Sequence, residues 1–234
     1  MDTSCILLFI FILFLLYILH NTNKETYINI KIPNNILKYF TKTEFLKNTG
    51  DFKITYVKYK NNSIYSNSYI DSTVSDFLKK TENTSNNRYQ IKQIFNKNEL
   101  TKYILKNAYK PLIKVLGLNE NNIKSGFIRV SKEKWTFDYH YDCLNLLLFQ
   151  LYGTRIIYTK KNKNSKEVKH ILKPGDILYI PMGEYHKVKT NSELNINFNI
   201  ILNEHNINKI LKCKKQFGHD FKIQDKKCKT NNCI

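Results

Sequence analysis

Arginine is scarce in this chain, although its charge balance is strongly basic. Lysine and arginine together number 38 against 19 acidic residues, a net charge of +19, yet only Arg88, Arg129 and Arg155 are arginine. A nucleic-acid-binding surface usually gathers basic residues and places arginine beside exposed aromatic side chains, whereas the lysines here are spread along the chain. Asparagine, lysine and isoleucine are all abundant and have A/T-rich codons, so a biased genome explains the charge, and RNA is kept as an alternative partner.

Charge of either sign is absent from residues 5–19, "CILLFIFILFLLYIL". As a helix this run would be roughly 22 Å long, against a hydrocarbon core of ~30 Å. A cleaved signal peptide is the alternative, but no lysine precedes the run and no small-residue cleavage site follows it. We therefore expect residues 1–20 to be a membrane anchor. Because lysines lie only on its C-terminal side, the positive-inside rule places the domain in the cytosol, with the secretory lumen as the alternative.

Closely spaced cysteine pairs are also missing. The chain has five cysteines: Cys5, Cys143, Cys213, Cys228 and Cys233. An odd number without tight spacing argues against a disulfide framework. The three C-terminal cysteines and His219 do not match the usual spacing of zinc ligands. We expect residues 205–234 to be a basic tail with incidental cysteines.

The rest of the chain divides by pattern into three further parts. We expect residues 21–36 to be a linker and residues 37–124 a small α/β lead-in. Within the lead-in the patterns predict a strand over 51–59, a loop over 61–72, and helices over 39–50, 72–81 and 96–118. Over residues 125–204, eight short apolar runs alternate with turn residues. So many short strands predict a mainly β fold, a double-stranded β-helix of the jelly-roll or cupin-like barrel type.

Lysine is absent from residues 137–155, "FDYHYDCLNLLLFQLYGTR", in a chain otherwise rich in it. His140 and Asp142 are two residues apart, so on a regular strand their side chains project from the same face. His186 follows another predicted strand and is the candidate third ligand. Two histidines and one carboxylate on one face form the facial triad of non-haem Fe(II) oxygenases. The alternative is a polar strand edge on which His140 and Asp142 merely pair.

Two longer motifs surround these candidate ligands, "HYDCLNLLLFQLYGTR" and "KPGDILYIPMGEYH". Their distinctive residues are Asn145, Gln150, Gly153 and Arg155 in the first motif and Gly175, Asp176, Pro181, Gly183 and His186 in the second. With these motifs, the sequence from Tyr39 to Leu202 resembles the JmjC and cupin-like 2-oxoglutarate oxygenases, in particular the group around the asparaginyl hydroxylase of hypoxia-inducible factor. In that family the His-x-Asp pair is followed by Asn, Gln and Gly-x-Lys, and a Gly-Asp turn precedes the distal histidine.

The resemblance implies an Fe(II)- and 2-oxoglutarate-dependent hydroxylase that acts on a protein or peptide side chain. His140, Asp142 and His186 would hold the iron. Arg155 would bind the far carboxylate of 2-oxoglutarate, where the family usually has lysine. The alternative functions are a catalytically inactive, membrane-tethered cupin-like binding module and a basic RNA-associated protein.

The resemblance also implies further contacts to the cosubstrate, with two departures from the family pattern. The residues that correspond to the family's further cosubstrate contacts are Asn145, Asn197 and Thr136. Asn145 is one position early, so its side chain can point elsewhere. The place where the family often has a hydroxyl residue is Phe137, and Thr136 lies one residue before it.

The absence of lysine around Arg155 has a physical reason if this stretch lines a closed pocket. A cation buried there costs several kcal/mol unless it is paired, and arginine pairs with a carboxylate through two hydrogen bonds. The alternative is that Arg155 lies at a strand end with its guanidinium in water. In "LNINFNII" asparagines alternate with apolar residues, so they face either the pocket or water.

Overall fold

The computed structural model describes residues 27–28, 30–60, 68–80, 87–94, 98–132 and 136–216. The expected membrane anchor at residues 1–20 lies outside this part of the chain, as do residues 217–234. Within the described part, no helix combines the length and the apolar character needed to cross a bilayer.

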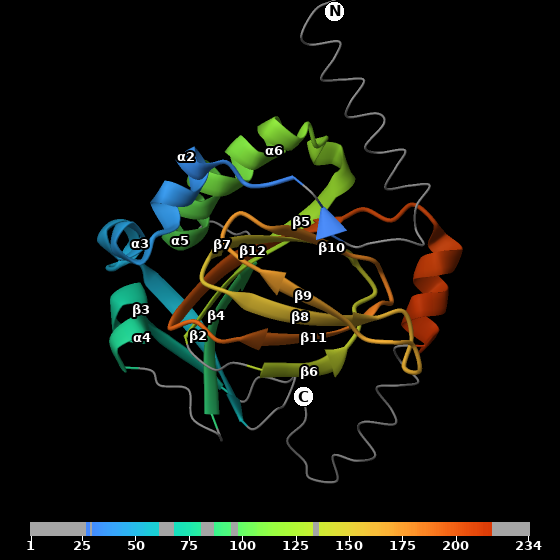
Figure 1. Ribbon diagram of the computed structural model, residues 1–234. Coiled ribbons are helices and arrows are strands. Elements are labelled where there is room, and N and C mark those ends of the chain that lie inside the picture. Colours follow the sequence, from blue (N-terminus) through green and yellow to red (C-terminus); the bar gives the residue numbers. More distant parts are fainter. Residues whose placement is uncertain are drawn as a thin grey trace, which may run out of the picture.

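The larger of two antiparallel sheets has eight strands and carries one wall of the barrel (Figure 1). In spatial order its strands are β1 (Tyr27–Ile28), β10 (Ile177–Ile180), β7 (Asn145–Tyr152), β12 (Leu194–Leu202), β5 (Ile123–Lys132), β4 (Asn87–Ile94), β2 (Lys53–Lys60) and β3 (Ser68–Thr73).

The smaller sheet forms the opposite wall of the barrel. Its four strands are β6 (Thr136–His140), β11 (Tyr185–Thr190), β8 (Arg155–Lys160) and β9 (Val168–Leu172). The strands from β5 to β12 number eight and fill residues 123–202. The prediction of a mainly β, jelly-roll or cupin-like fold is therefore confirmed.

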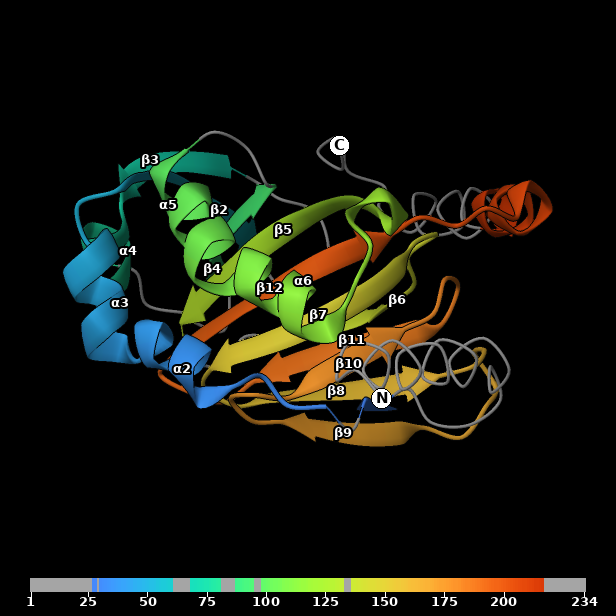
Figure 2. The same cartoon turned by 90° about the horizontal axis from the view of Figure 1, so that it is seen from above.

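Helices cover the outer face of the large sheet, opposite the small sheet (Figure 2). They are α2 (Asn34–Leu37), η1 (Lys38–Phe40), α3 (Lys42–Thr49), α4 (Val74–Lys80), α5 (Glu99–Ile104), η2 (Leu105–Tyr109), α6 (Lys110–Leu116) and η3 (Glu120–Asn122). The expected helix over 96–118 is divided by the π-helical turn η2, after which Pro111 occupies the first turn of α6. Proline is tolerated there because the first turn has no intrahelical partner for the missing N–H.

The two faces of the large sheet bury two separate hydrophobic clusters. On the helix side, Phe149, Ile196 and Phe198 pack with the helical residues. On the inner side, Leu148 and Leu178 of the large sheet pack with Ile157 and Val188 of the small sheet, among others. The period-2 alternation of β7 and β12 thus divides their residues between the helix layer and the barrel interior.

Three segments are more ordered than their patterns predicted. Part of the expected linker at residues 21–36 is structured, because β1 pairs with β10 and Ile32 and Ile36 are buried in the helix-side core. The expected loop over 61–72 contains most of β3, which pairs with β2. Residues 207–216 of the expected tail are helical and lie at one end of the barrel (Figures 1 and 2).

Candidate metal and anion site

The three predicted metal ligands come together at one end of the barrel. His140 is the last residue of β6, Asp142 lies in the turn that leads to β7, and His186 is on β11. Their potential ligand atoms all lie within 4.8 Å of one another. The His186 Nε2 is 3.8 Å from a carboxylate oxygen of Asp142, and the two imidazole centroids are 4.1 Å apart. The geometry is that of two imidazoles and one carboxylate around a common point.

A β-bulge, rather than a regular strand, brings His140 to the interior. His186 pairs with His140, but Val188 pairs with Phe137, so β6 has one residue more than β11 over this interval. A bulge of this kind resets the alternation of side chains. Phe137 and His140 can therefore both face inward, with ring centroids 4.4 Å apart. Asp142 lies beyond the end of β6, so the expected i, i+2 placement on one strand is replaced by a strand end and a turn.

Backbone carbonyl groups orient both imidazoles of this triad. The Nδ1 of His140 lies 2.8 Å from the Asp138 carbonyl oxygen, and the Nδ1 of His186 lies 3.1 Å from that of Glu184. If each Nδ1 donates its proton there, each Nε2 is left as a lone-pair donor toward the common point. Burial lowers the pKa of the His186 imidazole, although the nearby Asp142 carboxylate opposes this. The site therefore favours neutral, metal-binding histidine.

Arg155, the first residue of β8, is completely buried. Its Nε and both terminal nitrogens have no hydrogen-bond partner. Burial lowers the pKa of its guanidinium well below the usual value, and the neighbouring Arg129 adds to this. The alternative in which Arg155 extends into water at a strand end is therefore wrong. A buried cation without a protein partner is costly, so this position is suited to binding an anion.

The turn that carries Arg155 is fixed by its neighbours on the large sheet. Gly153 has a φ of +75°, and a Cβ there would lie 2.2 Å from the Leu194 carbonyl oxygen, so only glycine fits. The Gln150 amide donates to the carbonyl of Gly153, and the Asn195 amide donates to that of Thr154. These contacts fix the start of β8 and with it the position of the arginine.

The asparagine face of β12 points into the protein and not to water. Asn195, Asn197 and Asn199 are at most 3% exposed, while the residues between them belong to the helix-side core. The Asn197 amide donates to the backbone carbonyl of Arg129, and its oxygen accepts a hydrogen bond from Asn199. Asn197 is therefore inside the barrel, with both ends of its amide engaged by the protein.

Asn145 lies at the triad end of β7, whereas Thr136 lies on β6 across β11 from the Arg155 end of β8. The oxygen of Asn145 accepts hydrogen bonds from the Tyr179 hydroxyl and the Met182 backbone N–H, and its amide donates to Glu204. Asn145 thus ties β7 to β10 and to the turn after it. Thr136 starts β6, four residues before His140, and pairs with Lys189. Their roles toward a cosubstrate stay predictions.

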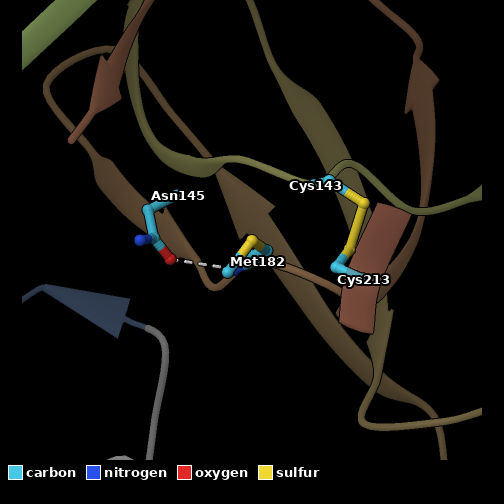
Figure 3. The surroundings of a disulfide bond; sticks show 4 residues. All are labelled: Cys143, Asn145, Met182 and Cys213. Atoms are coloured by element: carbon cyan, nitrogen blue, oxygen red, sulfur yellow. Dashed lines mark hydrogen bonds between the residues drawn. A yellow bond between two sulfur atoms is a disulfide. The ribbon is translucent and has the colours of Figure 1, made fainter. Parts of the chain in front are cut away.

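A disulfide joins Cys143 to Cys213 (Figure 3). Cys143 directly follows Asp142, and Cys213 lies in the helix over residues 207–216. The expectation of a tail with incidental cysteines is therefore wrong for this part of the chain. The two cysteines are 70 residues apart in sequence, so no spacing rule could have paired them. The bond attaches the C-terminal helix to the turn that bears a candidate metal ligand.

Sequence reasoning missed one further residue of the interior, Arg129 on β5. It is half-buried, and its Nε is buried without a hydrogen-bond partner. Burial lowers the pKa of its guanidinium, while Tyr59 and Asp142 favour the charged form. A signal was available, because Arg129 is one of only three arginines in a lysine-rich chain.

Comparison with known proteins agrees with this architecture. Residues 118–210 match the JmjC domain family. No curated protein sequence matches the chain at a significant level. A solved structure of Escherichia coli YcfD has a TM-score of 0.52 at 14% identity, with 84% of this chain and 54% of that chain covered. At so low an identity, the structural similarity shows a shared fold alone.

Two other solved structures have lower scores. One of YcfD, described as a ribosomal oxygenase from Escherichia coli, has a TM-score of 0.47 at 16% identity and covers 74% of this chain and 46% of that one. The cupin domain of Drosophila melanogaster CENP-C has a TM-score of 0.31 at 18% identity, with 32% and 59% covered. This chain spans less than two thirds of the length of each of these proteins.

Proposed function

We propose that this chain, whose residues 118–210 match the JmjC domain family, is an Fe(II)- and 2-oxoglutarate-dependent dioxygenase that hydroxylates a protein side chain. The observation that carries the proposal is Arg155. It is a fully buried cation without a hydrogen-bond partner, inside the same barrel as the triad of His140, Asp142 and His186. The choice of a protein side chain as substrate rests on the family resemblance.

The triad fits a divalent iron by the chemistry of its donors. Two neutral imidazoles and one carboxylate are the protein ligands of non-haem Fe(II) oxygenases, and they leave positions open for other ligands. The carbonyls of Asp138 and Glu184 hold the two imidazole rings in place before any ion binds. Bound iron and 2-oxoglutarate would supply the oxidation of a substrate C–H bond by dioxygen, with succinate and CO₂ as co-products.

Arg155 fits the far carboxylate of the cosubstrate. On the paired strands β8 and β11, His186 lies opposite Thr159 and Thr190 lies opposite Arg155. Four residues of strand separate these two levels, roughly 13 Å at ~3.3 Å per residue. An arginine side chain and a five-carbon dicarboxylate can bridge such a distance end to end. In this position Arg155 would orient the cosubstrate and exclude ligands without a second carboxylate.

The test is an anaerobic titration of the purified protein with Fe(II), in the presence and absence of 2-oxoglutarate. The proposal expects a metal-to-ligand charge-transfer band in the visible region only when both are present. The control is the Arg155→Met protein, in which the band should need a higher 2-oxoglutarate concentration. If the wild-type protein binds no 2-oxoglutarate at millimolar concentration with iron present, the oxygenase proposal falls. A non-catalytic cupin-like binding module then takes its place.

We further propose that the domain works in an oxidising compartment, the secretory lumen rather than the cytosol. The Cys143–Cys213 disulfide supports this, because such bonds are rare where glutathione keeps thiols reduced. Asn61 and Asn83 begin Asn-x-Ser sequons, both outside the described residues. In a eukaryotic host, a glycan that disappears in the Asn61→Gln/Asn83→Gln double variant would support the lumen. An unglycosylated chain with free thiols at Cys143 and Cys213 would restore the cytosolic assignment.

A further inference from the structure

A second arginine faces the interior of the barrel, on the sheet opposite Arg155. On β5, Ile128 and Val130 belong to the helix-side core, so the side chain of Arg129 between them faces the small sheet. Phe127, two residues from Arg129, packs against the inner cluster. The Arg129 guanidinium lies 4.9 Å from the centroid of the Phe127 ring. Arg129 therefore reaches into the space between the sheets.

Strand register places Arg129 between Arg155 and the triad. On the paired strands β12 and β5, Asn195 lies opposite Ser131 and Asn197 lies opposite Arg129. Asn195 lies at the Arg155 end of the barrel, because its side-chain amide donates a hydrogen bond to the carbonyl of Thr154, the residue before Arg155. The other end of β12 is the triad end, where Leu202 pairs with Asn145. Arg129 pairs with Asn197, which is two residues along β12 from Asn195. Arg129 therefore lies about 6.6 Å closer to the triad than Asn195 does.

The charges in this interior do not balance. Arg129 lies close enough to Arg155 to help lower the pKa of its guanidinium. The carboxylate that favours the charged form of Arg129 is Asp142. That carboxylate is also a candidate metal ligand, so a bound cation would draw on the same negative charge. Among the described groups that act on the two arginines, Asp142 is the carboxylate, and an anionic ligand would add negative charge between them.

Unpartnered polar atoms continue across the neighbouring strands. The Gln150 Oε1 on β7, the Ser131 Oγ on β5 and the Gln90 Nε2 on β4 are all buried without a hydrogen-bond partner. Ser131 pairs with Gln90 in register, and the Gln150 amide donates to Asn195, the residue opposite Ser131. Buried polar groups without partners are rare in folded proteins. The Ser131 hydroxyl and the Gln90 amide nitrogen are donors and, like the two arginines, fit an anionic ligand, whereas the Gln150 oxygen is an acceptor.

We propose that Arg129 is a specificity-determining residue that binds the carboxylate nearer the triad, while Arg155 binds the far one. This inference rests on the proposed function, since it assigns a second contact to the same cosubstrate. With one arginine for each carboxylate, the pocket selects dicarboxylates over monocarboxylates. The two arginines also hold the dicarboxylate without a metal ion.

The test uses metal-free protein in EDTA and isothermal titration calorimetry with three probes. They are 2-oxoglutarate, 2-oxopentanoate, which keeps only the carboxylate beside the keto group, and 4-oxopentanoate, which keeps only the far one. The variants are Arg129→Met and Arg155→Met, with Arg129→Lys as a conservative variant. Lys169→Met is the matched control, because Lys169 is an exposed cation on β9 of the same barrel.

We expect wild-type protein to bind 2-oxoglutarate roughly 10- to 100-fold more tightly than either monocarboxylate, since each charge-assisted pair contributes that much. Arg129→Met should bind 2-oxoglutarate no better than 4-oxopentanoate, and Arg155→Met no better than 2-oxopentanoate. Arg129→Lys should lie between wild type and Arg129→Met. Lys169→Met should behave as wild type.

Other outcomes overturn the inference, and they show whether the proposed function fails with it. If Arg129→Met discriminates among the probes as wild type does, Arg129 does not contact the ligand. If Arg129→Met instead loses ligand-free Mn(II) binding, its role is to position Asp142. If wild type binds 2-oxoglutarate only when iron is present, the inference falls and the oxygenase stands. If it binds none even with iron, both fall.

Discussion

The two ends of the barrel differ in what the polypeptide itself supplies. At the triad end, both histidines are oriented by backbone carbonyls, and their ligand atoms already converge with that of Asp142. At the other end, Arg155 is buried with three nitrogens unpartnered. The first end therefore presents a donor set that fits a cation, and the second presents a buried cation that fits an anion. The comparison teaches that one barrel can hold groups suited to ligands of opposite charge at its two ends.

The two ends are also held together by different means. The triad end is joined to the C-terminal helix by the Cys143–Cys213 disulfide (Figure 3), beside Met182 and Tyr185 of a small apolar cluster. The Arg155 end is held by a turn at Gly153 that packs directly on the backbone of Leu194. One end therefore depends on a covalent bond and the other on close backbone packing.

The largest expected effect is on metal binding at the triad end. His140→Ala, Asp142→Ala and His186→Ala should each weaken Fe(II) binding on the order of 100-fold or more, because a three-ligand site has no spare donor. His170→Ala is the matched control, since His170 is buried on β9 and bonds Thr159 instead. Anaerobic Fe(II) titration measures the affinities. If losing His170 abolishes binding while losing His186 does not, the distal ligand is misassigned.

The next effect concerns the covalent support of the triad end. Cys213→Ser should lower the free energy of unfolding by about 2–4 kcal/mol, because the bond closes a long loop in the unfolded chain. Hydrogen exchange over residues 207–216 should rise before that of the barrel strands. Cys228→Ser, which leaves this disulfide intact, is the control and should unfold as wild type in urea. Equal destabilisation by both variants would show that the bond does not support the fold.

The turn at the Arg155 end can be compared with its counterpart at the triad end. Gly153 and Gly183 both have positive φ, +75° and +83°, but an added Cβ meets the Leu194 carbonyl oxygen at 2.2 Å only at Gly153. At Gly183 the atom that it would meet is the Cys213 Sγ at 3.9 Å. We expect Gly153→Ala to cost about 2–3 kcal/mol and Gly183→Ala about 1 kcal/mol. Urea unfolding of the pair measures the difference, and similar losses would contradict the close packing.

The smallest expected effect separates binding from stability at Arg155. Arg155→Met should raise the KM for 2-oxoglutarate roughly 10- to 100-fold, and Arg155→Lys less, because lysine keeps the charge but not the two-pronged contact. Without cosubstrate, Arg155→Met should raise the free energy of unfolding by about 1–2 kcal/mol relative to wild type, because a buried unpaired cation is removed. Succinate formation and urea unfolding are the two measurements. Unchanged 2-oxoglutarate dependence would contradict the assignment.

Local signals predicted the fold class and the members of the triad. Short apolar runs with turn residues predict the strands, and the two motifs contain the triad residues His140, Asp142 and His186. The same signals failed where the pattern is irregular. The bulge in β6 moves His140 to the inner face, and alternation along a regular strand could not foresee it.

The sequence by itself determined which residue types were available: three arginines in a lysine-rich chain, a His-x-Asp pair and a distal histidine. Only the tertiary structure decided their surroundings. Burial and the loss of water are properties of packing between two sheets, so they make Arg155 an unpartnered cation and bring Arg129 beside it. The pairing of Cys143 with Cys213 was decided in the same way, because contact between residues 70 positions apart depends on how the chain folds back on itself.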